Sequence, residues 1–314
     1  MSKKIIVAFF NKGSKKEHIV EWETKLKKWY SNFHLVPLNS KDAKKAQIAL
    51  VWKPSMKEVL SLEHLTAIIC LGQGVDHIVN DSQIPRDVSV YRIVDPYMAK
   101  SMSHWVILSI LNYIRDYDGY RDQQKKRIYK SRKIIDFMSI KIGIYGLGEI
   151  GTKVANDLSE LGFNVLGWSR TKKNIDKFNT YNGEKGFKFL LSNSDIHVCL
   201  LPLTKKTEKI FNFSTFSEMK NHVCFINAGR GDHVDEKDLL SFCNSKIKLA
   251  ILDVFSAEPL QQNHPFWNQK NIIIWPHVSA ETNVDTAAEQ IAKAIKLIHS
   301  GITPENKIDN KLGY

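Results

Sequence analysis

Residues 141–161 read KIGIYGLGEIGTKVANDLSEL, and this stretch decides the fold. The apolar run 142–145 predicts a buried strand, and the apolar positions after the glycines recur at helical spacing. Between the two lie Gly146, Gly148 and Gly151, in the G-x-G-x-x-G spacing typical of a dinucleotide-binding turn. A glycine-rich turn without a ligand is the alternative. Strand, loop and helix occur in the order that the motif requires, so we expect a dinucleotide-binding domain.

Each position of this loop has a physical reason. Gly146 permits the tight turn, Gly148 lets the backbone approach an anion, and Gly151 allows the helix to pack closely on the strand. The helix begins around Glu149 and Ile150, and its N-terminus would face the negative charge of a pyrophosphate.

Short apolar runs alternate with amphipathic segments along the whole chain, which predicts an α/β fold with parallel sheets and crossover helices. One sheet is expected from strands near residues 5–10, 33–36, 48–51, 67–70 and 88–93. A second, with the six strands of a doubly wound dinucleotide-binding domain, is expected near residues 142–145, 164–168, 196–200, 223–226, 249–253 and 272–275.

The length of 314 residues fits two doubly wound domains, a flavodoxin-like substrate domain and a Rossmann-like nucleotide domain. An apolar helix predicted at 101–117 carries a stripe that suggests burial between domains or subunits: Trp105, Leu108, Leu111 and Ile114. A last helix is predicted at 283–299, after the sixth strand. Because no further strand follows it, we expect this helix to return and pack on the first domain. The predicted domains are therefore 1–98 with 282–314, and 99–281.

Composition narrows the class of protein. Hydrophobic residues make up 43% and charged residues 25%, as in an ordinary globular protein and unlike a disordered chain. The net charge of +12 attracts anions, which include nucleic acids, small carboxylates and phosphorylated cofactors.

The cysteines and apolar runs indicate the compartment. The four cysteines are far apart and lack zinc-like spacing, so we expect reduced core residues: Cys70, Cys199, Cys224 and Cys243. The first apolar run is too short for a secretory signal, and no run approaches the roughly 20 residues that cross a bilayer. These features predict a cytoplasmic protein without a membrane partner.

Residues 121–133 hold seven Lys or Arg against the single Asp122. Tyr129 is the one aromatic residue among them, whereas nucleic-acid sites interleave basic and stacking residues. A solvated connector or a dimer arm is therefore favoured over a nucleic-acid patch.

The end of the second strand of the nucleotide domain predicts which dinucleotide binds. An NAD-preferring site places Asp or Glu there, about twenty residues after the loop. This chain has Ser169, Arg170, Thr171, Lys172 and Lys173 instead. A guanidinium, hydroxyls and an ammonium can hold a 2′-phosphate, which a carboxylate would repel. We expect NADP(H) to be preferred over NAD(H), the alternative being an exposed basic loop in a lysine-rich protein.

Three further segments follow strands of this domain, where an open α/β sheet binds its ligands: INAGRG at 226–231, LDVFSAEPL at 252–260 and WPHVSA at 275–280. They supply Arg230, Glu258 and His277. Such a set can clamp an anionic substrate and move a proton while a nicotinamide carries the hydride.

These motifs, in this order and spacing, resemble the D-2-hydroxyacid dehydrogenase family over nearly the whole chain, most closely its glyoxylate/hydroxypyruvate reductase A branch. The resemblance rests on the glycine loop, on the three segments just quoted, and on LGQGVD at 71–76 and LLPLT at 200–204. It implies a homodimeric two-domain dehydrogenase with its active site in the cleft between domains.

The resemblance also implies roles for single residues. Arg230 would bind the carboxylate and carbonyl oxygen of a 2-oxo acid, unless it forms a surface ion pair. His277 would be the general acid, with Glu258 pairing to it, favouring the imidazolium and fixing the ring. The alternative is a core histidine and an unrelated surface glutamate.

Further contacts follow from the same resemblance. Backbone N–H groups of the loop Gly72, Gln73, Gly74 and Val75 would face the substrate carboxylate, unless this is a plain turn. Trp52 would wall the pocket or simply pack. Asp253 would lie near the nicotinamide carboxamide, and other positions would line the cofactor: Pro202, Ala228 and Gly229.

Two histidines remain. His104 stands where the family often has an acidic group, and a packed or interface role is favoured over a second base. His197 is expected in the core, and no cluster has metal-ligand spacing.

The predicted activity is NADPH-dependent reduction of small 2-oxo acids such as glyoxylate and hydroxypyruvate to 2-hydroxy acids. The alternatives are a phosphoglycerate-type or phenylpyruvate-type dehydrogenase, and a dinucleotide-sensing corepressor-like binding protein.

Overall fold

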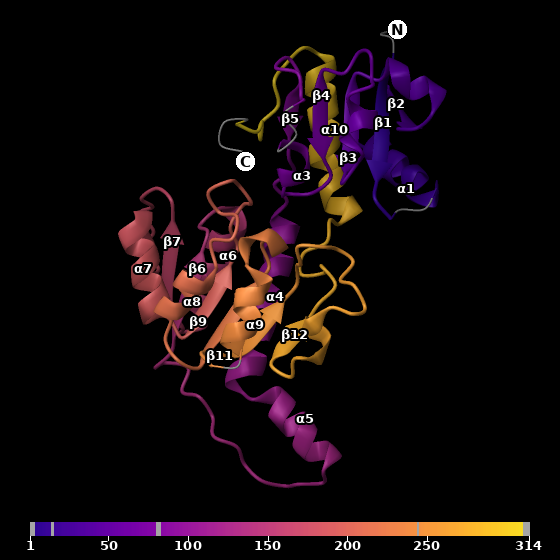
Figure 1. Ribbon diagram of the computed structural model, residues 1–314. Helices are drawn as coiled ribbons and strands as arrows, with labels where there is room; N and C mark the ends of the chain where they lie inside the picture. The colour runs from indigo at the N-terminus through magenta and orange to yellow at the C-terminus, as the bar shows by residue number, and fades with distance from the viewer. Residues whose placement is uncertain (1–3, 14–15, 80–82, 244, 310–314) are drawn as a thin grey trace. The chain divides into compact units, whose positions relative to one another are not determined.

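The computed structural model describes residues 4–13, 16–79, 83–243 and 245–309. The last five residues of the predicted first domain, 310–314, lie outside the described residues. The chain forms two compact units, Met1–Tyr97 with Thr282–Tyr314, and Met98–Glu281, each built on one parallel sheet (Figure 1). Within the described ranges, every helix is too short or too polar to cross a membrane.

The first unit has a five-stranded sheet in the order β2-β1-β3-β4-β5, as expected for a flavodoxin-like domain. Its strands are β1 (Ile5–Asn11), β2 (Phe33–Pro37), β3 (Ile48–Trp52), β4 (Ala67–Cys70) and β5 (Ser89–Tyr91). β5 is shorter than the predicted 88–93, because the N–H of Arg92 donates to the carbonyl of Asn306 and not to β4.

The helices of this unit are α1 (Lys16–Lys27), η1 (Lys41–Lys45), α2 (Met56–Val59), α3 (Asp76–Val79) and α10 (Val284–His299). α10 packs on α1, although nearly the whole chain separates them. Lys25 pairs with Asp285, and the hydroxyl of Tyr30 lies 2.6 Å from Nδ1 of His299. The apolar stripe of α10 is buried: Ala287, Ala288, Ile291, Ala292 and Ile295.

The second unit has a parallel sheet of seven strands in its described part, in the order β12-β11-β10-β9-β6-β7-β8. The strands are β6 (Lys141–Tyr145), β7 (Asn164–Ser169), β8 (Asn179–Asn182), β9 (Ile196–Cys199), β10 (Val223–Asn227), β11 (Ile247–Leu252) and β12 (Ile272–Ile274). The prediction of six strands was wrong, because the structure has a seventh strand, β8. This edge strand reads NTYN and is half exposed, so it leaves no apolar run in the sequence.

Helices cover both faces of this sheet: α4 (Pro96–Ile114), α6 (Glu149–Glu160), α7 (Gly183–Asn193), α8 (Phe213–Glu218) and α9 (Glu236–Cys243), with η2 (Gly231–His233) and η3 (Pro265–Asn268). Side chains alternate along each strand. In β6, Ile144 packs into the core under α4 and α6, whereas Tyr145 packs into the core under α7, α8 and α9. This is the doubly wound arrangement that the sequence predicts.

α4 begins five residues earlier and ends three residues earlier than predicted. Pro96 suits the first helical turn, and Asp95 accepts a hydrogen bond from the N–H of Tyr97 at 2.8 Å. Of the predicted stripe, Trp105 and Ile114 are buried within this chain, whereas Leu108 and Leu111 are 45% and 39% exposed, and their burial against another subunit stays a prediction. His104 is also exposed on the single chain, so it does not pack within this chain, and the interface role stays a prediction.

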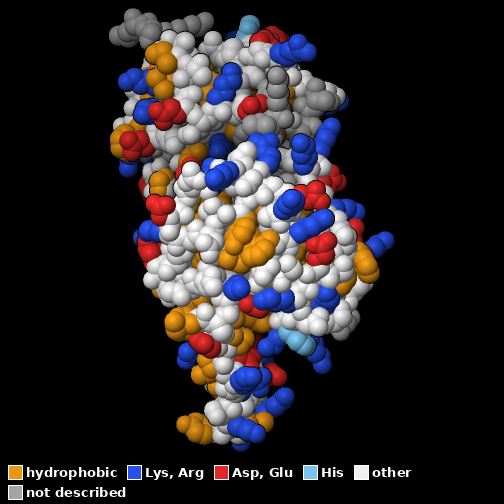
Figure 2. All heavy atoms as spheres, turned by 90° about the vertical axis from the view of Figure 1, so that its left-hand side faces the viewer, with side chains coloured by type: hydrophobic (Ala, Val, Ile, Leu, Met, Phe, Trp, Pro, Cys, Tyr) orange, Lys and Arg blue, Asp and Glu red, His pale blue; other side chains and the backbone are white. Residues whose placement is uncertain are grey.

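The basic run forms the end of α5 (Tyr117–Lys125) and an exposed return segment (Figure 1). We name residues 117–138 the arm. The segment runs back along α5, since the N–H of Arg132 donates to the hydroxyl of Tyr120 at 3.0 Å and Arg132 pairs with Asp116. Figure 2 shows hydrophobic and basic side chains mixed at the projecting end of this unit.

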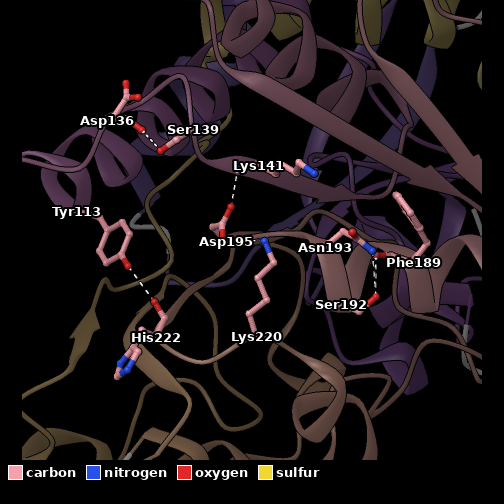
Figure 3. Close-up of polar contacts among 10 residues, drawn as sticks. All are labelled: Tyr113, Asp136, Ser139, Lys141, Phe189, Ser192, Asn193, Asp195, Lys220 and His222. Atoms are coloured by element: carbon pink, nitrogen blue, oxygen red, sulfur yellow. Dashed lines mark hydrogen bonds and ion pairs between the residues drawn. The ribbon is translucent and has the colours of Figure 1, made fainter.

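At the amino ends of its strands, the second sheet is held by a carboxylate (Figure 3). Asp195, just before β9, accepts from the N–H of Lys141 at 2.8 Å and from Nζ of Lys220 at 2.9 Å. One side chain thus ties the starts of β6 and β9 to the segment before β10, at the edge opposite the predicted site.

Two predictions about buried polar residues are confirmed. All four cysteines are buried and free of disulfides. His197 is fully buried in β9, and its Nδ1 lies 2.9 Å from the hydroxyl of Tyr145. Burial lowers the pKa of His197 to about 3, so the ring is neutral in the folded protein.

Candidate active site

Parallel strands bring the loops that follow them to one edge of the sheet. The chain reverses its direction of strand addition between β6 and β9, and ligands of such sheets bind in the crevice formed there. The backbone N–H groups of Gly146, Leu200, Ala228, Asp253 and Trp275 each donate to the strand end beside them, so the sheet holds all five loops where they begin.

The glycine loop has the geometry that its spacing predicts. Gly146 has φ +108°, and a Cβ there would lie 2.7 Å from the carbonyl oxygen of Leu200. A Cβ on Gly151 would overlap the carbonyl oxygen of Gly146. A Cβ on Gly148 would meet no described atom within 4 Å, and no side chain caps the start of α6 there. The helix start is therefore open to an anion, which fits a pyrophosphate. Glu149 and Ile150 form the first residues of α6.

Arg230 follows β10 on a loop shaped by Asn227, which is buried. The amide of Asn227 donates to the carbonyl of Arg230 at 2.9 Å, and its Oδ1 accepts from the N–H of Gly229 at 3.1 Å. The N–H of Arg230 donates to Nδ1 of the buried His233 at 3.0 Å. The guanidinium is half-buried, and its Nη1 donates to the carbonyl of Gly229 at 2.9 Å.

His277 occupies a left-handed backbone conformation, with φ +59°. Asp253 holds this turn. It is fully buried after β11, and its two carboxylate oxygens accept from the N–H groups of Val278 and Ser279 at 2.9 and 3.1 Å. Such φ values are uncommon outside glycine and persist where the surroundings hold them.

His277 and Glu258 form a hydrogen-bonded pair. Nδ1 of His277 lies 3.0 and 2.8 Å from the two carboxylate oxygens of Glu258, and the side chains are 28% and 22% exposed. A carboxylate only accepts, so Nδ1 carries the hydrogen. Nε2 is therefore the ring atom available for proton transfer.

Direct contacts join the three segments. A Cβ on Gly231 would overlap the backbone of Phe255 and Ser256, so the Arg230 loop lies directly against the loop that carries Glu258. Glu258 in turn contacts His277. The structure thus brings the segments of all three predicted catalytic residues together at one edge.

The segment after β7 is exposed from Arg170 through Lys173. Ser169 is buried at the strand end, and its hydroxyl donates to the carbonyl of Thr171 at 2.7 Å, which shapes the turn. The basic side chains are accessible to a phosphate. Pro202 and Ala228 follow β9 and β10 at the same edge.

The remaining predicted residues lie in the first unit, where they cluster. A Cβ on Gly72 would overlap the ring of Trp52, and the rings of Trp52 and His77 meet edge to face at 4.8 Å. Oε1 of Gln73 is buried without a hydrogen-bond partner in the described structure. The predicted contacts of Trp52 and of residues 72–75 with the substrate stay predictions.

The sequence reasoning missed several residues that hold the site. Asn227, His233 and Asp253 shape the Arg230 and His277 turns, although only Asp253 was assigned a role, toward the cofactor. Asp253 directly follows β11 and Asn227 is the last residue of β10, so a place at a strand end was the one available signal for these two, whereas His233 at the end of η2 gave none. Among the described residues, no group of three or more His, Cys, Asp or Glu side chains could hold a metal ion.

Comparison with known proteins identifies the class. Residues 107–279 match the family model described as D-isomer specific 2-hydroxyacid dehydrogenase, NAD binding domain. A curated relative, glyoxylate/hydroxypyruvate reductase A of Photorhabdus laumondii, is 35% identical over 300 residues, covering 94% of this chain and 96% of the relative.

Two solved structures are similar over the whole fold. An NADPH-dependent glyoxylate/hydroxypyruvate reductase from Sinorhizobium meliloti, in complex with NADP and sulfate, has a TM-score of 0.91 at 31% identity, covering 99% of this chain and 100% of that one. A D-isomer specific 2-hydroxyacid dehydrogenase from Xanthobacter autotrophicus Py2, in complex with NADPH and MES, has a TM-score of 0.91 at 30% identity, covering 100% of both chains.

The chain therefore belongs to the D-2-hydroxyacid dehydrogenase family, a class of NAD(P)-dependent oxidoreductases. Within that family it lies in the glyoxylate/hydroxypyruvate reductase A branch. The resemblance seen in the sequence is confirmed.

Proposed function

We propose that the protein reduces small 2-oxo acids, glyoxylate and hydroxypyruvate foremost, to 2-hydroxy acids with NADPH. The observation that carries the proposal is the His277–Glu258 pair at 2.8 Å, on a loop in direct contact with the Arg230 segment. The names of the relatives give the substrate class, since the curated relatives are glyoxylate/hydroxypyruvate reductases.

In this proposal the guanidinium of Arg230 binds the substrate carboxylate and carbonyl oxygen. Two parallel hydrogen bonds from one planar fork would fix the orientation of a planar 2-oxo acid. The Asn227 and His233 contacts hold the backbone that carries this fork.

His277 donates a proton from Nε2 to the carbonyl oxygen as the carbonyl carbon is reduced. Glu258 accepts the hydrogen bond from Nδ1–H and so holds the ring with Nε2 available to the substrate. When bound, the nicotinamide cofactor supplies the hydride. Gly146, Gly148 and Gly151 would hold its pyrophosphate at the start of α6, with Pro202, Ala228, Gly229 and Asp253 near the rest of the molecule.

NADP(H) is the proposed cofactor. Arg170, Thr171 and Lys172 are exposed at the end of β7, where a 2′-phosphate would lie, and no carboxylate occupies these positions. Two solved relatives carry NADPH or NADP.

We further propose that the working form is a homodimer. The support is a set of large apolar side chains that the single chain exposes on α4 and the arm: Leu108, Leu111, Tyr117, Tyr120, Ile128, Tyr129, Ile134, Phe137 and Met138. Soluble chains rarely expose such residues together without a partner. Analytical ultracentrifugation tests this proposal, and a monomer at micromolar concentration contradicts it.

The enzyme assay is a panel of 2-oxo acids followed by NADPH and NADH absorbance. We expect the highest kcat/KM for glyoxylate or hydroxypyruvate with NADPH. Preference for phosphohydroxypyruvate or phenylpyruvate would favour the other dehydrogenase types. Dinucleotide binding without turnover of any substrate would favour a sensing protein.

A further inference from the structure

A second histidine–carboxylate pair lies beside the first. Nε2 of His264 and Oε2 of Glu236 are 3.3 Å apart, and both side chains are about four-fifths buried, at 21% and 22% exposure. Neither residue has a role in the mechanism above. Both lie in the second unit, Glu236 at the start of α9 and His264 at the cap of η3.

The ring of His264 has a defined hydrogen position. Its Nδ1 accepts from the N–H of Phe266 at 3.3 Å, so Nε2 carries the hydrogen and donates to Glu236. The same ring packs edge to face on Phe266 at 4.5 Å, and Phe266 contacts Phe255 at 6.2 Å. His264 is therefore fixed both by hydrogen bonds and by the core.

Glu236 ties together two ends of one loop. While Oε2 accepts from His264, Oε1 accepts from the N–H of Ser256 at 3.2 Å. Residues 256 and 264 flank Glu258, so this single carboxylate closes the loop that carries the partner of His277. The N–H of Phe255 also donates to Oε1 of Glu258, at 3.3 Å, which links the backbone held by Glu236 to the Glu258 side chain.

The position of Glu236 also couples this loop to Arg230. Only η2 and two residues separate Arg230 from α9, and Gly231 packs directly against Phe255 and Ser256. A carboxylate in the first turn of a helix is favoured by the helix dipole, which further stabilises Glu236 at the start of α9.

We propose that Glu236 and His264 are positioning residues for the proposed reaction, which hold Glu258 where it orients His277. They touch neither substrate nor cofactor in this reading. This inference rests on the proposed function where it is tested by kcat, but not where it is tested by a measurement without turnover.

The test is Glu236→Gln, with His264→Phe as a second variant. The amide of Gln has one acceptor oxygen and one NH₂ donor, whereas both partners, the N–H of Ser256 and Nε2 of His264, are donors. One of these two hydrogen bonds is therefore lost. His264→Phe keeps the packing on Phe266 and removes the Nε2–H donor. We expect kcat to fall about 10- to 100-fold in each, the effect of a misplaced catalytic group, with the KM for NADPH unchanged. In the double variant the losses should be less than additive, because both changes act on the contacts that residue 236 makes with this loop.

Asp195→Asn is the matched control. Asp195 also accepts from one backbone N–H and one side-chain donor, at 2.8 and 2.9 Å, but at the opposite edge of the same sheet (Figure 3). We expect it to lower thermal stability without lowering kcat. An equal loss of kcat in Asp195→Asn would mean that Glu236 acts only through stability, and would overturn the proposal.

A readout without turnover separates this inference from the function. The Nδ1–H of His277 in its bond to Glu258 should give a downfield proton resonance, assigned by its loss in Glu258→Gln. We expect Glu236→Gln and His264→Phe to shift or broaden it, and Asp195→Asn to leave it in place. An unchanged resonance together with unchanged kcat refutes the positioning role. A wild-type protein that turns over no 2-oxo acid contradicts the proposed function instead. In that case the resonance still tests whether Glu236 and His264 hold Glu258 in place.

Discussion

Replacing His277 by Asn tests the proposed chemistry with little disturbance of the backbone. The residue has φ +59°, where Asn is much better tolerated than Ala or branched residues. Asn removes the ionisable ring, while its amide can still donate to Glu258, which lies 2.8 Å from Nδ1 in the native protein. A positioned general acid contributes about 10²- to 10⁴-fold, which corresponds to about 3–5 kcal/mol of transition-state stabilisation.

We therefore expect kcat for glyoxylate to fall by at least about a hundredfold, the lower end of that range. Dissociation of NADPH, measured by fluorescence titration, should be unchanged, because the glycine loop is untouched. His277→Ala should show the same kinetic loss with a further loss of thermal stability, since Ala adopts this φ less readily than Asn. His104→Asn, at an exposed position of α4, is the control and should keep full activity. Near-normal turnover in His277→Asn would refute the general-acid role.

Three further predictions concern the cofactor and the core. Arg170→Glu should lower kcat/KM for NADPH about 10- to 100-fold, which is the value of one charge-assisted hydrogen bond, and should raise kcat/KM for NADH. An unchanged ratio of the two kcat/KM values contradicts the 2′-phosphate contact. Gly151→Ala should lower the free energy of unfolding by about 1–3 kcal/mol and weaken NADPH binding, because its Cβ would overlap the carbonyl of Gly146, and calorimetry with and without NADPH checks both. His197 has a folded pKa of about 3 against 6.5 for the free side chain, so from pH 7 to pH 4 the unfolded state gains a proton and stability falls by about 3 kcal/mol. The variant Tyr145→Phe/His197→Phe should lack this part of the acid destabilisation in urea titrations; an equal loss in both proteins argues against it.

Much of the fold could be predicted because buried parallel strands are apolar runs. β6 and β9 are buried along most of their length, and their residues stand out in the sequence. β8 could not be found in this way, because it is a polar edge strand whose place is set by pairing with β7. Which side chains of the stripe the same chain covers could not be predicted for a related reason: apolar spacing indicates a helix face, but does not say whether this chain or another subunit covers Leu108.

The candidate site was predictable to the extent that it follows topology. Loops after parallel strands meet at one edge, so Arg230, Glu258 and His277 could be placed together before any coordinates. Glu236 and His264 could not, since the residues are 28 apart and their contact depends on how the loop around Glu258 folds back on α9. Sequence spacing carries no information about such tertiary hydrogen bonds.

The turn at His277 explains why a fully buried Asp253 stands at the end of β11. A non-glycine residue in the left-handed region costs about 1–3 kcal/mol, so the turn would relax unless other contacts held it. The two bonds from Val278 and Ser279 to the Asp253 carboxylate, at 2.9 and 3.1 Å, contribute about 1.5–3 kcal/mol each and offset that cost. Because Asp253 follows β11 and the turn follows β12, the paired strands fix both ends of this contact. The imidazole is thus oriented by the sheet edge and by Glu258 independently, and this gives the fixed ring position that the proposed proton transfer requires.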